Sequence, residues 1–283
     1  RFDLMGIHDI ETMNQISDTL HKIDPTIFIY GEGWTAGASP LPEDLRAVKK
    51  NTYQLKKIAA FSDDIRDGLH GPYNKRKVNG FVSAAIGTKQ SIQFGIVAST
   101  LHSQVNYQQV NYSKKPWAAE PYQTINYVSC HDDNTLFDRL SHGNPNATEE
   151  ELIKMDKLSQ AIVLTSQGVV FIHSGAEMLR TKKGIENSYN LPDSINEIDW
   201  SRKVKYKNVF NYYQSLISLR KNHPAFRMPT SKMIQNHLAF TNTEDPLLVI
   251  YQINNHANND KWKDIIVLLN GEAKDKNVQL PVG

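Results

Sequence analysis

Short apolar runs alternate with helix-like periods along most of this chain, and this alternation constrains the fold more than any other feature. The apolar runs lie at residues 26–30, 58–61, 124–129 and 168–172, and Phe2-Asp3 closes an earlier one. Each run is short and rich in β-branched or aromatic residues, as buried strands are. Because strands that alternate with helices form parallel βαβ units, the sequence predicts an α/β fold over residues 1–225.

Four segments between or after these runs carry the 3.6-residue period of amphipathic helices. They lie at residues 10–24, near 88–101, at 148–162 and at 209–222. The third has the strongest start signal, because Thr148 and Glu151 form a Thr-x-x-Glu capping box. The fourth stops at Asn222-His223-Pro224, where proline cannot continue a helix.

After Pro224 the alternation of predicted strands and helices ends. Residues 234–240, 247–253 and 264–270 read as three strands without helices between them. This pattern is typical of antiparallel sheets, whose strands need no helical crossover. We therefore expect two units, a larger α/β portion at 1–225 and a small β domain at 226–283.

Composition excludes several functional classes. The 32 Lys and Arg residues nearly balance the 30 Asp and Glu residues, so the net charge of +2 leaves no basic footprint for nucleic acid. No apolar stretch approaches the ~18 residues of a membrane span. Cys130 is the only cysteine, which rules out an intrachain disulfide framework and a cysteine-based zinc site. Glycine-rich nucleotide motifs are also missing.

Carboxylates follow several of the predicted strands. They are Asp3, Glu32, Asp63-Asp64, Asp132-Asp133 and Glu177. In parallel α/β sheets and barrels, catalytic groups collect beyond the carboxyl ends of the strands. A pair of carboxyl groups on opposite sides of a sugar is the usual equipment of a glycosidase.

Glu32 is the most distinctive of these carboxylates, because it stands between Gly31 and Gly33 and is followed by Trp34. We expect the two glycines to leave backbone room for a ligand. The Trp34 indole offers a face on which a sugar can stack. A solvated surface glutamate would need neither neighbour.

Three segments of the chain resemble signature regions of a known enzyme family. Residues 1–6 read Arg-Phe-Asp-Leu-Met-Gly, residues 30–34 read Tyr-Gly-Glu-Gly-Trp, and residues 127–132 read Tyr-Val-Ser-Cys-His-Asp. They resemble, in the same order, three of the four signature regions of the α-amylase superfamily of glycoside hydrolases. Together with residues 173–182, 187–190 and 198–200, they are most similar to type I pullulanases, the α-1,6 debranching branch. The similarity covers nearly all of residues 1–225.

The resemblance implies a fold in which this chain supplies the C-terminal part of a (β/α)8 TIM barrel, strands four to eight, followed by an all-β sandwich domain. Asp3 would be the nucleophile, Glu32 the general acid/base and Asp132 the third carboxylate. Arg1 would orient the nucleophile and His131 would bond sugar hydroxyls. Further candidates for substrate contact or loop support are Trp34, Arg180, Asn187 and Tyr189.

The activity implied is that of a retaining glycoside hydrolase acting on α-1,6 branch points of pullulan, starch or glycogen-derived glucans. Alternatives are an α-1,4-glucan hydrolase or branching enzyme on the same barrel, or a non-catalytic glucan-binding fragment. No cofactor is required, and a structural calcium has no signal here. Because the chain opens at the end of a strand, we expect an upstream polypeptide segment to complete the barrel. The compartment stays open, since members of the family occur in several.

Overall fold

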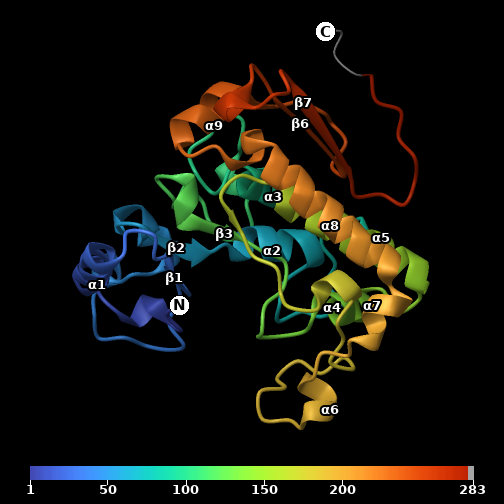
Figure 1. The fold of residues 1–283 in the computed structure, drawn as a ribbon, viewed down its shortest axis with the longest axis horizontal. Helices are drawn as coiled ribbons and strands as arrows, with labels where there is room; N and C mark the ends of the chain where they lie inside the picture. The colour runs from blue at the N-terminus through green and yellow to red at the C-terminus, as the bar shows by residue number, and fades with distance from the viewer. Residues whose placement is uncertain (280–283) are drawn as a thin grey trace.

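The structure, a computed structural model, describes residues 1–279, and a four-stranded parallel sheet forms its centre (Figure 1). Its strands are β1 (Ile29–Gly31), β2 (Ile58–Phe61), β3 (Thr124–Asn126) and β4 (Val169–Val170). They lie side by side in chain order, and every neighbouring pair is parallel. Phe2 adds a parallel bridge to Gly31. The predicted α/β class with a parallel sheet is therefore confirmed.

Helices lie between these strands and follow them in the chain. They are α1 (Ile10–Ile23), α2 (Asp63–His70), α3 (Lys89–Ile96), α4 (Leu136–Gly143), α5 (Glu149–Thr165), α6 (Asp193–Asn196), α7 (Ser201–Lys205), α8 (Lys207–Asn222) and α9 (Ser231–His237). The capping box of α5 is confirmed, since the Thr148 N–H donates to Glu151 Oε2 at 2.7 Å and the Glu151 N–H donates to Thr148 Oγ1. None of the helices in the part of the chain described is long and apolar enough to cross a membrane.

Two helices, α2 and α4, give no clear signal in the sequence. Each helix has only eight residues, which is too short for a 3.6-residue period to stand out in the sequence. Asp64 and Asp67 of α2 are completely buried, and Asp138 and Arg139 of α4 are nearly so. Ion pairs and hydrogen bonds satisfy these buried charges.

The antiparallel sheet follows α8 and contains β5 (Leu238–Phe240), β6 (Leu248–Ile253) and β7 (Ile265–Asn270), with β6 in the middle. The predicted strands at 247–253 and 264–270 are confirmed. The predicted strand at 234–240 is wrong over its first half, because residues up to His237 belong to α9. Thr230 caps that helix by accepting a hydrogen bond from the Met233 N–H.

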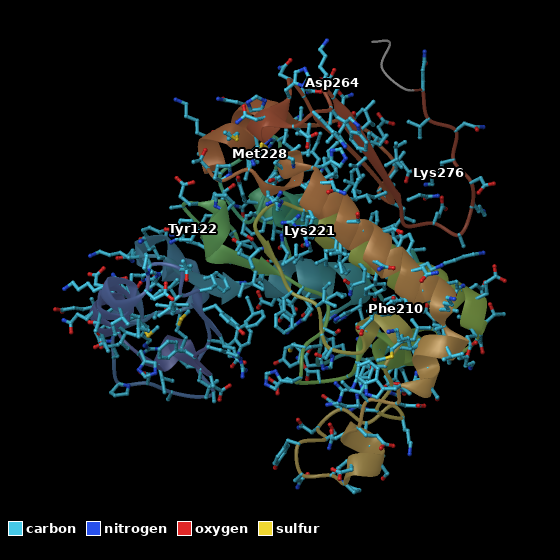
Figure 2. All side chains as sticks on the ribbon, viewed as in Figure 1. Tyr122, Phe210, Lys221, Met228, Asp264 and Lys276 are labelled. Carbon is cyan, nitrogen blue, oxygen red and sulfur yellow. The ribbon has the colours of Figure 1, made fainter. Side chains whose placement is uncertain are left out.

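The sandwich expected for this domain is not complete within residues 1–279, where the antiparallel strands form one sheet. Its buried face packs on helices of the α/β portion instead of on a second sheet. Phe94, Leu152, Val249 and Ile253 belong to one continuous hydrophobic core, as does Met228, which Figure 2 labels just after α8. The division near residue 225 stays a prediction, and the core is continuous across it.

The two faces of the parallel sheet differ in their packing. On β2, Ile58 and Ala60 contribute to the core under the helices, whereas Ala59 and Phe61 point to the opposite face. This alternation follows from the two-residue period of a strand. The opposite face is lined by aromatic rings. Phe61 makes edge-to-face contacts, with its ring centroid 4.9 Å from that of Tyr127 and 5.5 Å from that of Phe171.

One buried acid lies between α5 and α8. Asp156 is completely buried, and its only hydrogen bond among the described residues comes from the Tyr213 hydroxyl, at 2.7 Å. Its second carboxylate oxygen has no partner there. Burial raises the pKa of Asp156 from 3.8 to about 7. The hydrogen bond from Tyr213 lowers this pKa, but its effect is smaller than that of burial.

This pKa predicts a pH-dependent stability. Between pH 3.8 and about 7 the unfolded chain releases the Asp156 proton but the folded chain keeps it, so the free energy of unfolding falls as the pH rises. The total loss is on the order of 4 kcal/mol. Asp156→Asn has no proton to release, so it should be more stable than the parent at pH 8 and lose that advantage near pH 4.

Chemical denaturation at several pH values measures this difference. Glu150→Gln, an exposed change on the same helix, is the control and should follow the parent at every pH. Parallel pH curves for the parent and for Asp156→Asn would contradict the assignment of a protonated Asp156.

Candidate active site

Arg1 contacts three polar groups at the carboxyl ends of the parallel strands. Its Nη2 atom donates to Glu32 Oε1 at 2.5 Å and to Asp3 Oδ1 at 3.4 Å, and it lies 3.1 Å from His131 Nε2. Burial alone would lower the pKa of Arg1, but the hydrogen bond to Glu32 and the charges of Glu32, Asp3 and Asp132 outweigh it and raise that pKa. The guanidinium therefore stays charged among the carboxylates.

Glu32 is the buried member of this group, with 4% of its surface exposed. It follows β1 directly, and its backbone is fixed on both sides. The Glu32 N–H donates to Phe2 O at 3.0 Å, and the Gly6 N–H donates to Glu32 O at 3.1 Å. Its side chain is fixed as well, because the Leu4 N–H donates to Oε2 at 3.2 Å while Arg1 holds Oε1.

Asp3 lies beside Glu32 because Phe2 pairs with the last residue of β1. Its side chain is largely exposed, in contrast to that of Glu32. Asp3 Oδ1 and Glu32 Oε1 both accept from the same Arg1 nitrogen, at 3.4 and 2.5 Å. These two oxygens are therefore at most about 6 Å apart. Retaining glycosidases place their two carboxyl groups about 5–5.5 Å apart.

Asp132 joins the group through His131. Asp132 Oδ1 lies 3.4 Å from His131 Nε2, the ring nitrogen that also faces Arg1. Both side chains are more than half exposed and reach this place from the segment after β3. The structure thus brings Arg1, Asp3, Glu32, His131 and Asp132 together, as the sequence predicts, although they come from three separate segments.

The glycines beside Glu32 serve the protein's own packing and not, as expected from sequence, room for a ligand. A Cβ atom on Gly31 would lie 2.7 Å from Met5 Cβ. A Cβ atom on Gly33 would lie 2.7 Å from the backbone nitrogen of Lys49. Real Cβ atoms do not approach backbone this closely, so only glycine lets these segments meet around Glu32.

Trp34 packs on the aromatic face of the sheet and is half-buried. It shares that cluster with Tyr30, Tyr127 and Phe171, and with Cys130 next to His131. The indole therefore lies on the same side of the sheet as the carboxylate group. Its expected contact with a sugar stays a prediction.

A buried ionic network supports the site from beneath. Lys49 Nζ donates to both Asp63 and Asp64 at the start of α2. Asp64 also accepts hydrogen bonds from the Ser113 backbone and hydroxyl, and these contacts with Lys49 lower its pKa despite burial. For Asp63, burial prevails and raises the pKa. These carboxylates follow a strand, as the sequence indicates, but protein groups satisfy them.

The remaining predicted contacts do not join the carboxylate group. Arg180 binds its own loop, since its guanidinium donates to Ser174 O at 3.2 Å and to Asn196 O at 2.5 Å. Asn187 and Tyr189 are exposed in the segment held by that contact, which carries α6 at the bottom of Figure 1. The structure gives Arg180 the role of loop support, and the predicted substrate contacts of Asn187 and Tyr189 stay predictions.

Lys182 and His173 are two site residues that the sequence does not single out as a pair. Lys182 Nζ donates to His131 O at 3.4 Å and lies within the field of Asp132. His173 is buried, and burial together with the charges of Arg180, Lys182 and His131 lowers its pKa to about 4. It is therefore a neutral imidazole near pH 7. Its position after β4 is the sequence signal that could have indicated it.

Cys130, His131 and Asp132 bring one possible metal ligand each within 4.8 Å of one another. Burial raises the pKa of the Cys130 thiol to about 11. A protonated thiol is a poor ligand, because metals bind the thiolate. The donor set therefore does not favour a metal.

Comparisons with known proteins agree with the fold. The chain is 37% identical over 281 residues to the pullulanase of Bacillus subtilis strain 168, covering 99% of the chain and 38% of that protein. Residues 234–283 match the family model for the pullulanase all-beta domain. The structure superimposes on the crystal structure of Paenibacillus barengoltzii pullulanase in complex with maltohexaose and α-cyclodextrin with a TM-score of 0.92 and 40% identity, over 99% of this chain and 42% of that one.

The chain belongs to the pullulanase family. It spans about two fifths of the relatives that it matches. A second solved structure, pullulanase from Bacillus acidopullulyticus, is 42% identical with a TM-score of 0.91, over the whole of this chain and 33% of that one. The pullulanase fold thus accounts for the parallel sheet and for the separate antiparallel sheet.

The glycine contacts yield a prediction for this pullulanase segment. Gly33→Ala should lower the free energy of unfolding by about 1–3 kcal/mol, because the new Cβ atom would push the Lys49 backbone away. The same shift would disturb Glu32. Gly37→Ala is the matched control in the same loop, since a Cβ atom there meets nothing within 4 Å. Thermal melts of both variants test this, and equal melting temperatures would contradict it.

Proposed function

We propose that the protein carrying this chain is a retaining glycoside hydrolase that cleaves α-1,6 branch points of pullulan and starch-derived glucans. The proposal rests on one observation: a single nitrogen atom of Arg1 donates to both the exposed Asp3 carboxylate and the buried Glu32 carboxylate. Two carboxyl groups this close, in different surroundings, suit a double displacement at a sugar carbon.

In the proposed reaction, Glu32 must first take up a proton, because it is the general acid. The ionised Asp3 then attacks the anomeric carbon while the protonated Glu32 gives its proton to the departing glycosidic oxygen. The bond to the leaving sugar breaks as the covalent glycosyl-enzyme forms. Glu32, now ionised, takes a proton from water, and that water displaces Asp3 at the same carbon. Because the carbon is inverted twice, the product keeps its configuration. Arg1 keeps the Asp3 carboxylate in place for the first step.

Asp132 and His131 have the proposed task of holding the sugar hydroxyls. Their side chains are exposed beside Arg1 and are free to meet a ligand. Hydrogen bonds that the sugar hydroxyls donate to the Asp132 carboxylate, and that strengthen as the ring flattens toward an oxocarbenium ion, would stabilise the transition state more than the substrate. The Lys182 ammonium donates to His131 O and so helps to hold this segment in place.

The relatives support the substrate class. Solved pullulanases that this chain resembles are described as complexes with maltohexaose and α-cyclodextrin, with maltose and with maltotetraose. We propose the same class of α-glucan for this protein. We also propose that a further polypeptide segment completes the barrel, because Phe2 and β4 form the edges of the described sheet and the relatives are more than twice as long.

The linkage is tested by product analysis. Pullulan should yield maltotriose while amylose is left nearly intact, as expected of an enzyme that cleaves α-1,6 bonds. Chromatography of the digests measures both. Rapid cleavage of amylose would move the protein to the α-1,4 alternative, and the absence of cleavage of either glucan would remove the proposed activity.

The nucleophile is tested by substitution. Asp3→Asn should reduce kcat by about 10³-fold or more while glucan binding persists, because the amide cannot attack the anomeric carbon. Asp3 is exposed, so the variant should fold. The control is Asp18→Asn, which removes a surface carboxylate of α1 that pairs with Lys56. This variant should keep full activity. Undiminished kcat in Asp3→Asn would exclude Asp3 as the nucleophile.

A further inference from the structure

A groove lined by amide side chains lies between α3 and the loop that follows β5. It has a volume of about 560 Å³. Its lining includes Gln90, Gln93, Gln104, Gln109, Phe240 and Asn242. None of its lining residues belongs to the carboxylate group around Arg1, and Figure 1 shows α3 and β6 well above the N-terminus.

The walls of the groove are fixed to each other. Lys89, in the first turn of α3, donates to Thr243 O at 2.7 Å and to Asp245 O at 2.9 Å. Gln104 holds β5 through both ends of its amide, donating to Phe240 O and accepting from the Phe240 N–H, each at 2.8 Å. The groove is therefore a preformed feature and not a gap between mobile loops.

Of the other lining amides, Gln90 accepts from the Asn106 N–H at 2.8 Å, whereas the side chains of Gln93, Gln109 and Asn242 make no hydrogen bond within residues 1–279. Gln93 is 95% buried, since 5% of its surface is exposed, and its carbonyl oxygen has no hydrogen-bond partner within residues 1–279. A buried polar atom without a partner is unfavourable. This oxygen is itself covered by protein, so the exposed amides of the groove are the ones that a ligand can reach. Gln109 and Asn242 are exposed at the same groove.

The chemistry of the lining suits a ligand rich in hydroxyl groups. The exposed Glu244 carboxylate also lines the groove, where it can accept from hydroxyls and disfavours an anionic ligand. Each amide offers both a donor and an acceptor, which matches the dual character of a sugar hydroxyl. The Lys89 ammonium is occupied by two backbone carbonyls, so it does not provide a free cation for a phosphate or carboxylate. Phe240 adds an apolar surface at the base.

We propose that this groove binds a segment of an α-glucan chain at a second site, separate from the candidate active site. The identity of the sugar rests on the proposed function, whereas the neutral polyhydroxyl chemistry rests on the groove alone. A long glucan could then contact the protein at both places, and a short oligosaccharide would occupy them one at a time.

Calorimetric titration of the intact protein with maltohexaose tests the proposal. The Asp3→Asn background prevents turnover of the ligand. We expect two binding sites, and we expect Gln109→Ala or Asn242→Ala to weaken one of them about fivefold, the effect of losing one neutral hydrogen bond. Both side chains are exposed, so the variants should fold.

Gln108→Ala is the matched control, because Gln108 is the exposed neighbour of Gln109 but does not line the groove. It should leave both sites unchanged. A single maltohexaose site, or equal titrations for Gln109→Ala and Gln108→Ala, would overturn the proposal. Pullulan hydrolysis by the Asp3-containing protein is read separately, so failure of the second site and failure of the proposed activity are distinguishable.

Discussion

The contact between the Arg1 guanidinium and the buried Glu32 carboxylate is the interaction on which the rest of the site depends. A carboxylate with 4% exposure needs strong partners, and Glu32 has two, Arg1 and the Leu4 N–H. Hydrogen bonds to charged groups contribute about 1.5–3 kcal/mol. The same guanidinium faces Asp3 and His131, so one cation neutralises Glu32 and sets the positions of its neighbours.

Packing beneath this contact explains why the geometry is specific. The segments around Gly31 and Gly33 approach so closely that no side chain fits between them. Lys49, which lies against Gly33, is itself held by Asp63 and Asp64 at the start of α2. A change in this ionic network would therefore be transmitted through backbone contacts to Glu32. Rigid packing of this kind is how a fold holds reacting groups in place.

The sequence predicts the parts of this molecule whose signals are local. Apolar runs located β2 to the residue, and the Thr148 capping box located the start of α5. The carboxylates Asp3, Glu32 and Asp132 followed from strand-end placement and from motif resemblance. The helices α2 and α4 were missed because each has only eight residues, and the Thr230 cap of α9 was missed as well. The partners of Gly33 and Arg180 depend on tertiary contacts that no local pattern encodes.

The central claim is that Asp3 and Glu32 act as a close pair across a sugar carbon, which fixes the stereochemistry of the reaction. Proton NMR during the first turnovers of pullulan hydrolysis, before the anomers equilibrate, measures it directly. The account predicts that the newly formed reducing end is the α-anomer, because two displacements at one carbon restore its configuration. Initial release of the β-anomer would show a single displacement and would contradict the roles given to Asp3 and Glu32.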